Sequence, residues 1–178
     1  MWKYEDLLPV TKNSAIVTLG EGWTPLVRMQ QEEKKLPVKQ LWIKREEQNP
    51  AGSFKARGFS AALSLLMEQG LNKPAVPSPH RARMYSVRGF HRTAVAVNHN
   101  QIAEAQHTLG ALGISSSPEG AATRAGLLAL CDNGWIRSKD TVVLFNTSHA
   151  LKYNLSDSIA TVPTIRSYHE FLSSYERT

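Results

Sequence analysis

The lysine at position 55 is the residue of this sequence best placed to do chemistry. It lies in the stretch 48–58 (QNPAGSFKARG), after a short strand pattern and a glycine-containing turn, where a helix is expected to start. The partial positive charge of a helix N-terminus disfavours a second cation there, and so does desolvation at the edge of a sheet. Both effects favour the neutral amine that a lysine needs to condense with an aldehyde. Position alone also fits a solvated lysine, so the surrounding residues must decide.

The elements that would position this lysine can be predicted from the pattern of apolar residues. Residues 41–44 (LWIK) are typical of a strand, and Asn49, Pro50 and Gly52 indicate a turn after it. We expect a helix to follow, capped by Ser53, running to about Gln69 and stopped by Gly70. Its buried side is expected to consist of Ala62, Leu63, Leu65 and Leu66.

The second half of the chain continues the alternation of strands and helices. Such alternation favours an α/β fold with a mainly parallel sheet and flanking helices. One helix is expected to bury Ile102, Ala105 and Leu109, which share a face at helical spacing. The expected elements are a strand over 94–97, a helix capped by Asn98 or Asn100, a helix that starts with Ser117, Pro118 and Glu119, a strand over 141–145 and a short helix near 168–175.

The lysine motif also resembles that of a known family. The pattern N-P-x-G-S-F-K-x-R-G is similar to the cofactor-lysine motif of fold-type-II pyridoxal-phosphate enzymes, and specifically of the threonine synthase family. Three further blocks resemble that family in the same order: 19–26 (LGEGWTPL), 117–123 (SPEGAAT) and 147–152 (TSHALK). The resemblance covers about residues 2–78 and 94–153. It implies the α/β large domain of that fold.

The resemblance implies a role for each matching position. Lys55 would bind pyridoxal phosphate and later move protons on the α and β carbons of an amino-acid substrate. Thr147 would share a hydrogen bond with the pyridine nitrogen, where a hydroxyl leaves the ring unprotonated. The family reaction converts O-phosphohomoserine and water into threonine and phosphate, which makes the expected enzyme a lyase of threonine biosynthesis. The other positions expected near the cofactor or substrate are Thr24, Ser53, Phe54 and, for the cofactor, Ser78.

The similarity breaks after Ser78. In the family, a Ser-Gly-Asn-x-Gly loop follows, and its backbone amides hold the cofactor phosphate. Here residues 79–93 (PHRARMYSVRGFHRT) take its place, with four arginines and no acidic residue, and the similarity resumes only at Ala94. We therefore expect an incomplete large domain without the family's small domain. It would form a single truncated unit over residues 1–178, with an atypical arginine-rich junction loop at 79–93.

Two alternative hypotheses remain open. One is a non-catalytic, internally deleted remnant that cannot hold pyridoxal phosphate, because the phosphate loop is missing. Ser148 and Ala150 also replace two family glycines, whose conformational freedom a side chain removes. The other is a pyridoxal-phosphate-dependent enzyme similar to serine and threonine dehydratases, which share this fold.

The basic charge of the chain does not indicate a nucleic-acid partner. The net charge is +6, from 21 basic and 15 acidic residues. Without the four arginines of the junction, 17 basic residues stand against 15 acidic ones, so the excess is local. Only Tyr85 and Phe90 could stack on bases there. A small-molecule amino acid is therefore the expected partner, and an oligomer is possible.

Several other site types are not expected. The single cysteine, Cys131, excludes an internal disulfide and a cysteine metal cluster, and the histidine spacing does not suggest zinc. No apolar run reaches the roughly 18–20 residues of a membrane span, and the first ten residues lack the apolar core of a signal peptide. A cytoplasmic protein is expected. Glu21, Arg57 and Glu119 are expected to cap helices or form ion pairs rather than react.

Overall fold

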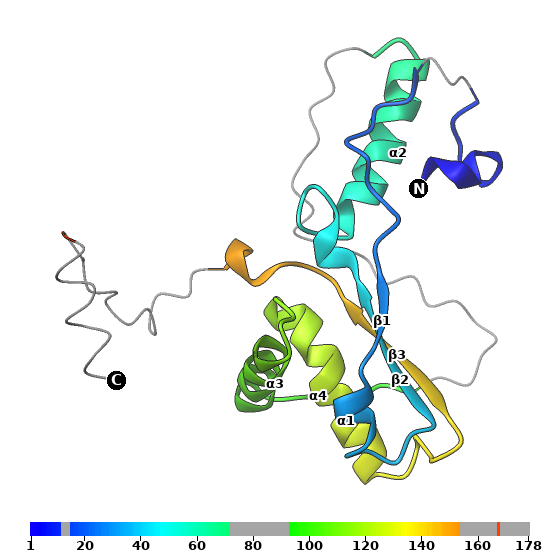
Figure 1. Ribbon diagram of the computed structural model, residues 1–178. Helices are drawn as coiled ribbons and strands as arrows, with labels where there is room; N and C mark the ends of the chain where they lie inside the picture. Colours follow the sequence, from blue (N-terminus) through cyan, green and yellow to red (C-terminus); the bar gives the residue numbers. More distant parts are fainter. Residues whose placement is uncertain (12–14, 72–92, 154–166, 168–178) are drawn as a thin grey trace.

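The computed structural model describes residues 1–11, 15–71, 93–153 and Ser167 of the chain. Three of the predictions, namely Ser78, the junction at 79–92 and the helix near 168–175, lie outside these residues. Figure 1 shows helices α1 (Gln30–Glu33), α2 (Lys55–Glu68), α3 (His99–Ala111) and α4 (Pro118–Asp132), strands β1 (Leu26–Arg28), β2 (Gln40–Arg45) and β3 (Thr141–Asn146), and 3-10 helices at Trp2–Leu7, Glu46–Gln48 and Ala150–Lys152.

The three described strands form one mixed sheet in the order β1-β2-β3. Strands β2 and β3 are parallel, with Ile43 opposite Leu144, whereas β1 is antiparallel to β2, with Val27 opposite Ile43. The prediction of a mainly parallel sheet is therefore confirmed for β2 and β3 and wrong for β1 and β2. The reason is the length of the connections: α2, α3 and α4 lie between β2 and β3, whereas only a short connection through α1 joins β1 to β2 and reverses the chain.

Helices α3 and α4 cover one face of this sheet, as Figure 1 shows. Alternate strand residues Leu41, Ile43 and Leu144 point into the core, where they meet Ala105 and Leu109 of α3. Ile102 packs at the margin, so the predicted buried face of α3 is confirmed. On the other face, Val143 and Phe145 are 53% and 42% exposed. The core that the described residues form therefore lies on one side of the sheet.

The predicted strand at 94–97 is wrong. These residues have no regular structure, and Ala94, Val95 and Ala96 are exposed. Val95 lies instead against α4, where its methyl group is 3.5 Å from the position of a Cβ at Gly126, and Val97 packs at the edge of the core. These residues contact a helix and do not pair with a strand. The intrinsic β-propensity of a short segment is weak, and side-chain packing in the tertiary structure outweighs it.

The buried side of α2 also differs from the prediction. Ala56, Ser60 and Ser64 are buried, whereas Ala62 is exposed and the leucines are half-buried. The cause is the N-terminal segment, whose backbone lies along the helix. The amide of Val17 donates to Ser64 Oγ at 2.8 Å, and Ser60 Oγ donates to the Val17 carbonyl at 2.7 Å. Small hydroxyl residues are needed there, since they satisfy a backbone that has no sheet partner.

The predicted helix boundaries are mostly confirmed. Asn98 caps α3 in a reciprocal pair with Gln101, and Ser117 Oγ accepts from the Gly120 amide at 3.2 Å to cap α4. Gly70 ends α2 with a φ of +82°, a value that glycine adopts without steric cost. The cap at Ser53 is displaced: α2 begins at Lys55, and Ser53 Oγ accepts from the Lys55 amide at 3.3 Å.

Shortening Leu109 tests the position of the core. Leu109 is 1% exposed, whereas Leu112, near the end of the same helix, is 39% exposed. We expect Leu109→Ala to lower the free energy of unfolding by about 2–5 kcal/mol, because it leaves a cavity, and Leu112→Ala to lower it by less than about 1 kcal/mol. Urea denaturation followed by circular dichroism measures both. Equal losses would contradict the assigned core.

Candidate functional site

A pocket of about 450 Å³ contains Lys55 and most of the residues that sequence analysis assigned to the site. It opens where the start of α2 meets the chain segment that follows β3. Ser53, Phe54 and Thr147 line it together with Lys55, although they are far apart in the sequence. The remaining lining residues are Glu119, Ser148, Lys152 and Tyr153.

Backbone hydrogen bonds fix the lysine turn against the end of β3. The Phe54 amide donates to the Thr147 carbonyl at 3.0 Å, and the His149 amide donates to the Gly52 carbonyl at 3.0 Å. Ser53 and Ser148 form an isolated antiparallel bridge between these two contacts. The turn before Lys55 is thus paired with residues almost a hundred positions later in the chain. This pairing holds Lys55 and Thr147 on the same pocket.

The start of α4 completes this corner of the molecule. The Ser117 amide donates to the Ser148 carbonyl at 2.8 Å, and Ser117 Oγ lies 3.4 Å from Thr147 Oγ1. Asn146 is fully buried, and a Cβ at Gly120 would lie only 2.3 Å from its Oδ1 atom. The glycine of the Ser-Pro-Glu-Gly motif is therefore required for the close approach of α4 to the end of β3.

Glu119 and Tyr153 form a hydrogen-bonded pair in the pocket. The Tyr153 hydroxyl donates to Glu119 Oε2 at 2.5 Å. This bond, helped by burial, raises the pKa of Tyr153 to about 12. Burial alone would raise the pKa of Glu119, but hydrogen bonds, first among them that of Tyr153, and the charge of Lys55 outweigh it and lower that pKa. Glu119 is therefore ionised at neutral pH, and it supplies the negative charge of the pocket.

The backbone at Ser148 and Ala150 is not strained. Among the described residues other than glycine, only Trp23 has a positive φ, at 53°. The serine and alanine that replace family glycines therefore adopt ordinary conformations. The backbone strain that a positive φ would cause at these two positions therefore does not arise in this structure.

Thr24 lies outside this pocket. It is 6% exposed and lines a separate cavity, which Phe54 and Arg57 also line. Its hydroxyl donates to Glu46 Oε1 at 2.6 Å and accepts from Arg57 Nη2 at 3.1 Å. Phe54 is common to the two cavities. The structure thus brings Ser53, Phe54, Lys55 and Thr147 together and leaves Thr24 in a neighbouring polar network.

The carboxylate of Glu46 is the centre of that network. Glu46 is 1% exposed, and Arg57 Nε and Nη2 donate to its two oxygens at 2.8 Å each. Asn49 Nδ2 donates to Glu46 Oε2 at 2.9 Å, and Asn49 Oδ1 accepts from the Gly22 amide at 2.9 Å. The network therefore joins the Gly-Glu-Gly-x-Thr-Pro segment, the turn after β2 and the first turn of α2.

These hydrogen bonds also set the ionisation of Glu46. Burial by itself raises the pKa of the carboxyl group, but hydrogen bonds from Arg57, Thr24 and Asn49 outweigh it and lower the pKa to about 2. Sequence analysis did not single out Glu46. The available signal was the position of Glu46 directly after an apolar strand. A glutamate that is buried at such a position needs a charged or hydrogen-bonding partner. Arg57, expected in an ion pair, is this partner.

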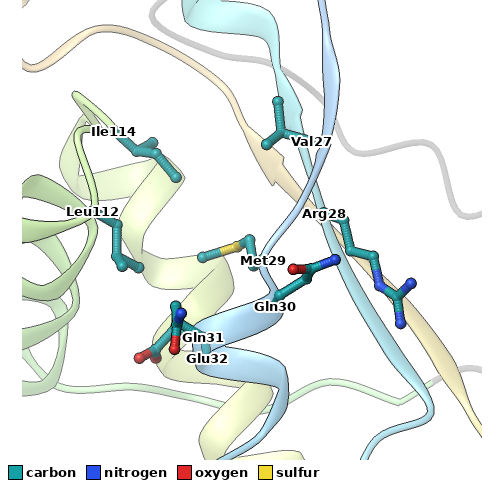
Figure 2. Close-up of a pocket in the computed structure, with 8 residues that line it drawn as sticks. All are labelled: Val27, Arg28, Met29, Gln30, Gln31, Glu32, Leu112 and Ile114. Carbon is teal, nitrogen blue, oxygen red and sulfur yellow. The ribbon is translucent and has the colours of Figure 1, made fainter.

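A second pocket of about 260 Å³, shown in Figure 2, lies between β1, α1 and the α3–α4 connection. Met29, Leu112 and Ile114 give it an apolar wall, and Glu32 lies at its margin. The Glu32 carboxylate is already bound by Arg124 Nη2 at 2.5 Å. None of the predicted site residues that the structure describes lines this pocket. No described group of three or more histidine, cysteine, aspartate or glutamate residues could hold a metal ion.

Comparison with known proteins agrees with the two motifs in the first half of the chain. Residues 17–78 match the family described as "Pyridoxal-phosphate dependent enzyme". The resemblance to the threonine synthase family is confirmed. The chain is 45% identical over 71 residues to the threonine synthase of Methanocaldococcus jannaschii, covering 40% of this chain and 18% of that protein. The threonine synthase of Methanosarcina acetivorans is 41% identical over 78 residues, covering 44% of this chain and 19% of that protein.

The matches to threonine synthases cover a small part of those proteins. That of Halalkalibacterium halodurans is 43% identical over 68 residues, again 19% of its length. The aligned part thus spans less than a fifth of each of the three relatives. The family match ends at residue 78, the position at which the motif similarity also breaks. Among the described residues, no helix is both long and apolar enough to cross a membrane.

Replacing Glu46 by glutamine tests the polar network. The matched control is Glu32→Gln. It removes the charge of another buried glutamate, which pairs with Arg124 Nη2 at 2.5 Å and lines a different pocket from Lys55. We expect each change to lower the free energy of unfolding by up to about 3–5 kcal/mol. Only Glu46→Gln should increase amide hydrogen exchange at residues 22–24 and 54–57. Equal exchange in the two variants would show that the network does not hold the turn.

Acid should weaken the same network. The pKa of Glu46 is about 2 in the folded chain, below its ordinary value of 4.5, so its stabilisation is present above pH 4.5 and is lost as the pH falls toward 2. The difference in unfolding free energy between the native chain and Glu46→Gln should therefore shrink over this range, by up to about 3 kcal/mol. Urea denaturation at pH 7, 4.5 and 3 measures it. A constant difference would contradict the assigned ionisation.

Proposed function

We propose that this chain carries the cofactor-lysine region of a threonine synthase-like, pyridoxal-phosphate-dependent lyase. The observation that carries the proposal is that Lys55, at the first position of α2, and Thr147, directly after β3, line one pocket. The motif around Lys55 and the similarity to threonine synthases support it. The substrate would be a small amino acid of the O-phosphohomoserine type, and the protein would act in the cytoplasm.

The described residues of the pocket fit the aldehyde and the pyridine nitrogen of pyridoxal phosphate. The cofactor has an aldehyde, which an amine such as that of Lys55 can bind covalently, and a pyridine nitrogen, which a hydroxyl such as that of Thr147 can meet. Ser53 and Phe54 provide a buried hydroxyl and an aromatic ring beside the lysine. A pocket of about 450 Å³ lies in the usual size range of cofactor sites.

Each of these residues has a distinct task in the proposed enzyme. When bound, pyridoxal phosphate withdraws electrons from the carbons next to the substrate nitrogen. The Lys55 amine would take up and return protons at the α and β carbons of the substrate. Thr147 would orient the ring without donating a full charge to it. Phe54 would provide an apolar ring beside the lysine, and it meets the ring of Phe145 edge to face at 6.0 Å.

The alternative of a non-catalytic remnant has its own support. The described part of the pocket has no row of free backbone amides for a phosphate, because the first amides of α2 bond to Ser53 and Phe54. The matched region also spans less than a fifth of each of these three threonine synthases. Under this hypothesis, residues 1–178 form one truncated domain without the small domain, and residues 79–93 form its junction. A dehydratase-like reaction would use the same lysine.

Covalent trapping of the cofactor tests the proposal. Purified protein is incubated with pyridoxal phosphate and reduced with borohydride, and the modified lysine is located by mass spectrometry. We expect Lys55 to be labelled, and Lys55→Ala to lose both the label and the long-wavelength absorption. Lys139→Ala, which removes an exposed lysine from a different pocket, should keep both. Equal labelling of many lysines would contradict the proposed site.

Product analysis separates the enzyme from the remnant. Phosphate release from O-phosphohomoserine, lost in Lys55→Ala, would support threonine synthase-like activity. Release of ammonia from serine or threonine would favour the dehydratase-like reaction instead. Labelling of Lys55 without any of these products would support the remnant.

A further inference from the structure

We propose that Lys152 is the binding residue for a phosphate monoester dianion in the Lys55 pocket. Lys152 lines this pocket from the 3-10 helix Ala150–Lys152, which directly follows the segment after β3. The proposal rests on the proposed function for the identity of the phosphate-bearing molecule, which is either the cofactor or the substrate. The phosphate site itself is argued from the charges and contacts of the described residues.

The position of Lys152 is fixed by the lysine turn. The stem of Lys152 lies over Gly52, because a Cβ at Gly52 would be 3.3 Å from Cε and 4.0 Å from Nζ. The Lys152 amide donates to the His149 carbonyl, and the His149 amide donates in turn to the Gly52 carbonyl. The backbone of Lys152 and the end of its side chain thus both lie near the turn that precedes Lys55. Lys55 and Lys152 therefore line one pocket from two paired segments.

The charges of the pocket favour an anion. None of the ion pairs formed among the described residues includes Lys55 or Lys152. The one carboxylate among the described residues that line the pocket, that of Glu119, already accepts a hydrogen bond from Tyr153. Two lysines and one carboxylate, whose lone pairs are partly used, therefore line this part of the pocket. When Lys55 is bound to the aldehyde of the cofactor, the charge of Lys152 would still attract a bound dianion.

Most backbone amides at the starts of the two nearby helices are already bonded within the described structure. At the start of α2, the amides of Lys55 and Ala56 bond to Ser53, and the Arg57 amide bonds to Phe54. At the start of α4, the amides of Gly120 and Ala121 bond to Ser117. Lys55 is needed for the aldehyde of the cofactor. Among the described residues that line the pocket, Lys152 therefore remains as the cation available to a phosphate group.

Binding measurements with and without the phosphate group test this role. The probes are pyridoxal phosphate against pyridoxal, and O-phosphohomoserine against homoserine, measured by calorimetry. Lys152→Ala should weaken binding of one phosphorylated probe at least tenfold and leave its unphosphorylated counterpart unchanged. Lys152→Arg should restore binding, and Lys139→Ala should have no effect. The affected pair identifies the source: the first pair indicates the cofactor, and the second indicates the substrate.

Inorganic phosphate separates this proposal from the proposed function. Its binding, followed by phosphorus NMR line broadening, needs neither the aldehyde nor catalysis, and Lys152→Ala should abolish it even in the Lys55→Ala background. If Lys55 is labelled by pyridoxal phosphate but Lys152→Ala binds every phosphate probe like the native chain, the phosphate site is refuted and the proposed function stands. If Lys55 is not labelled but inorganic phosphate binding depends on Lys152, the proposed function is refuted and the phosphate site stands. Since Lys152 is exposed, its replacement should leave the melting temperature unchanged.

Discussion

The buried ion pair between Glu46 and Arg57 is the interaction on which the lysine region depends. Its carboxylate receives both nitrogens of the Arg57 fork together with Thr24 and Asn49, which come from three separate segments. A buried carboxylate without these donors would be strongly destabilising, so each segment must keep its place for the charge to be tolerated. The network thereby determines where α2 starts, and hence where Lys55 lies.

A second constraint brings the distant half of the site to that lysine. The end of β3 pairs with the turn before α2 through the Phe54–Thr147 and Gly52–His149 hydrogen bonds. On the other side, α4 approaches Asn146 so closely that only glycine fits at position 120. The motifs around positions 55, 120 and 147 are therefore parts of one packed corner. This explains in physical terms why their residue types occur together in one chain.

Local rules predicted the parts of the fold that local interactions form. Asn98 and Ser117 cap their helices through their own side chains, and Gly70 stops α2 through its own conformational freedom. The strand expected at 94–97 failed, since its valines pack against α4 and the core instead of pairing. The buried side of α2 failed for a related reason. A hydrophobic pattern does not show that the backbone at Val17 will lie against Ser60 and Ser64.

The sequence alone determined the identity of the reactive groups and the order of the motifs that contain them. It identified Lys55, Ser53, Phe54 and Thr147, because their types and neighbours form specific local patterns. Only the tertiary structure decided which of them share a pocket: it placed Thr24 with Glu46 and added Glu119, Lys152 and Tyr153 beside Lys55. The reason is physical. Hydrogen bonds between segments up to about a hundred residues apart leave no periodic trace in the chain, whereas caps, turns and amphipathic faces do.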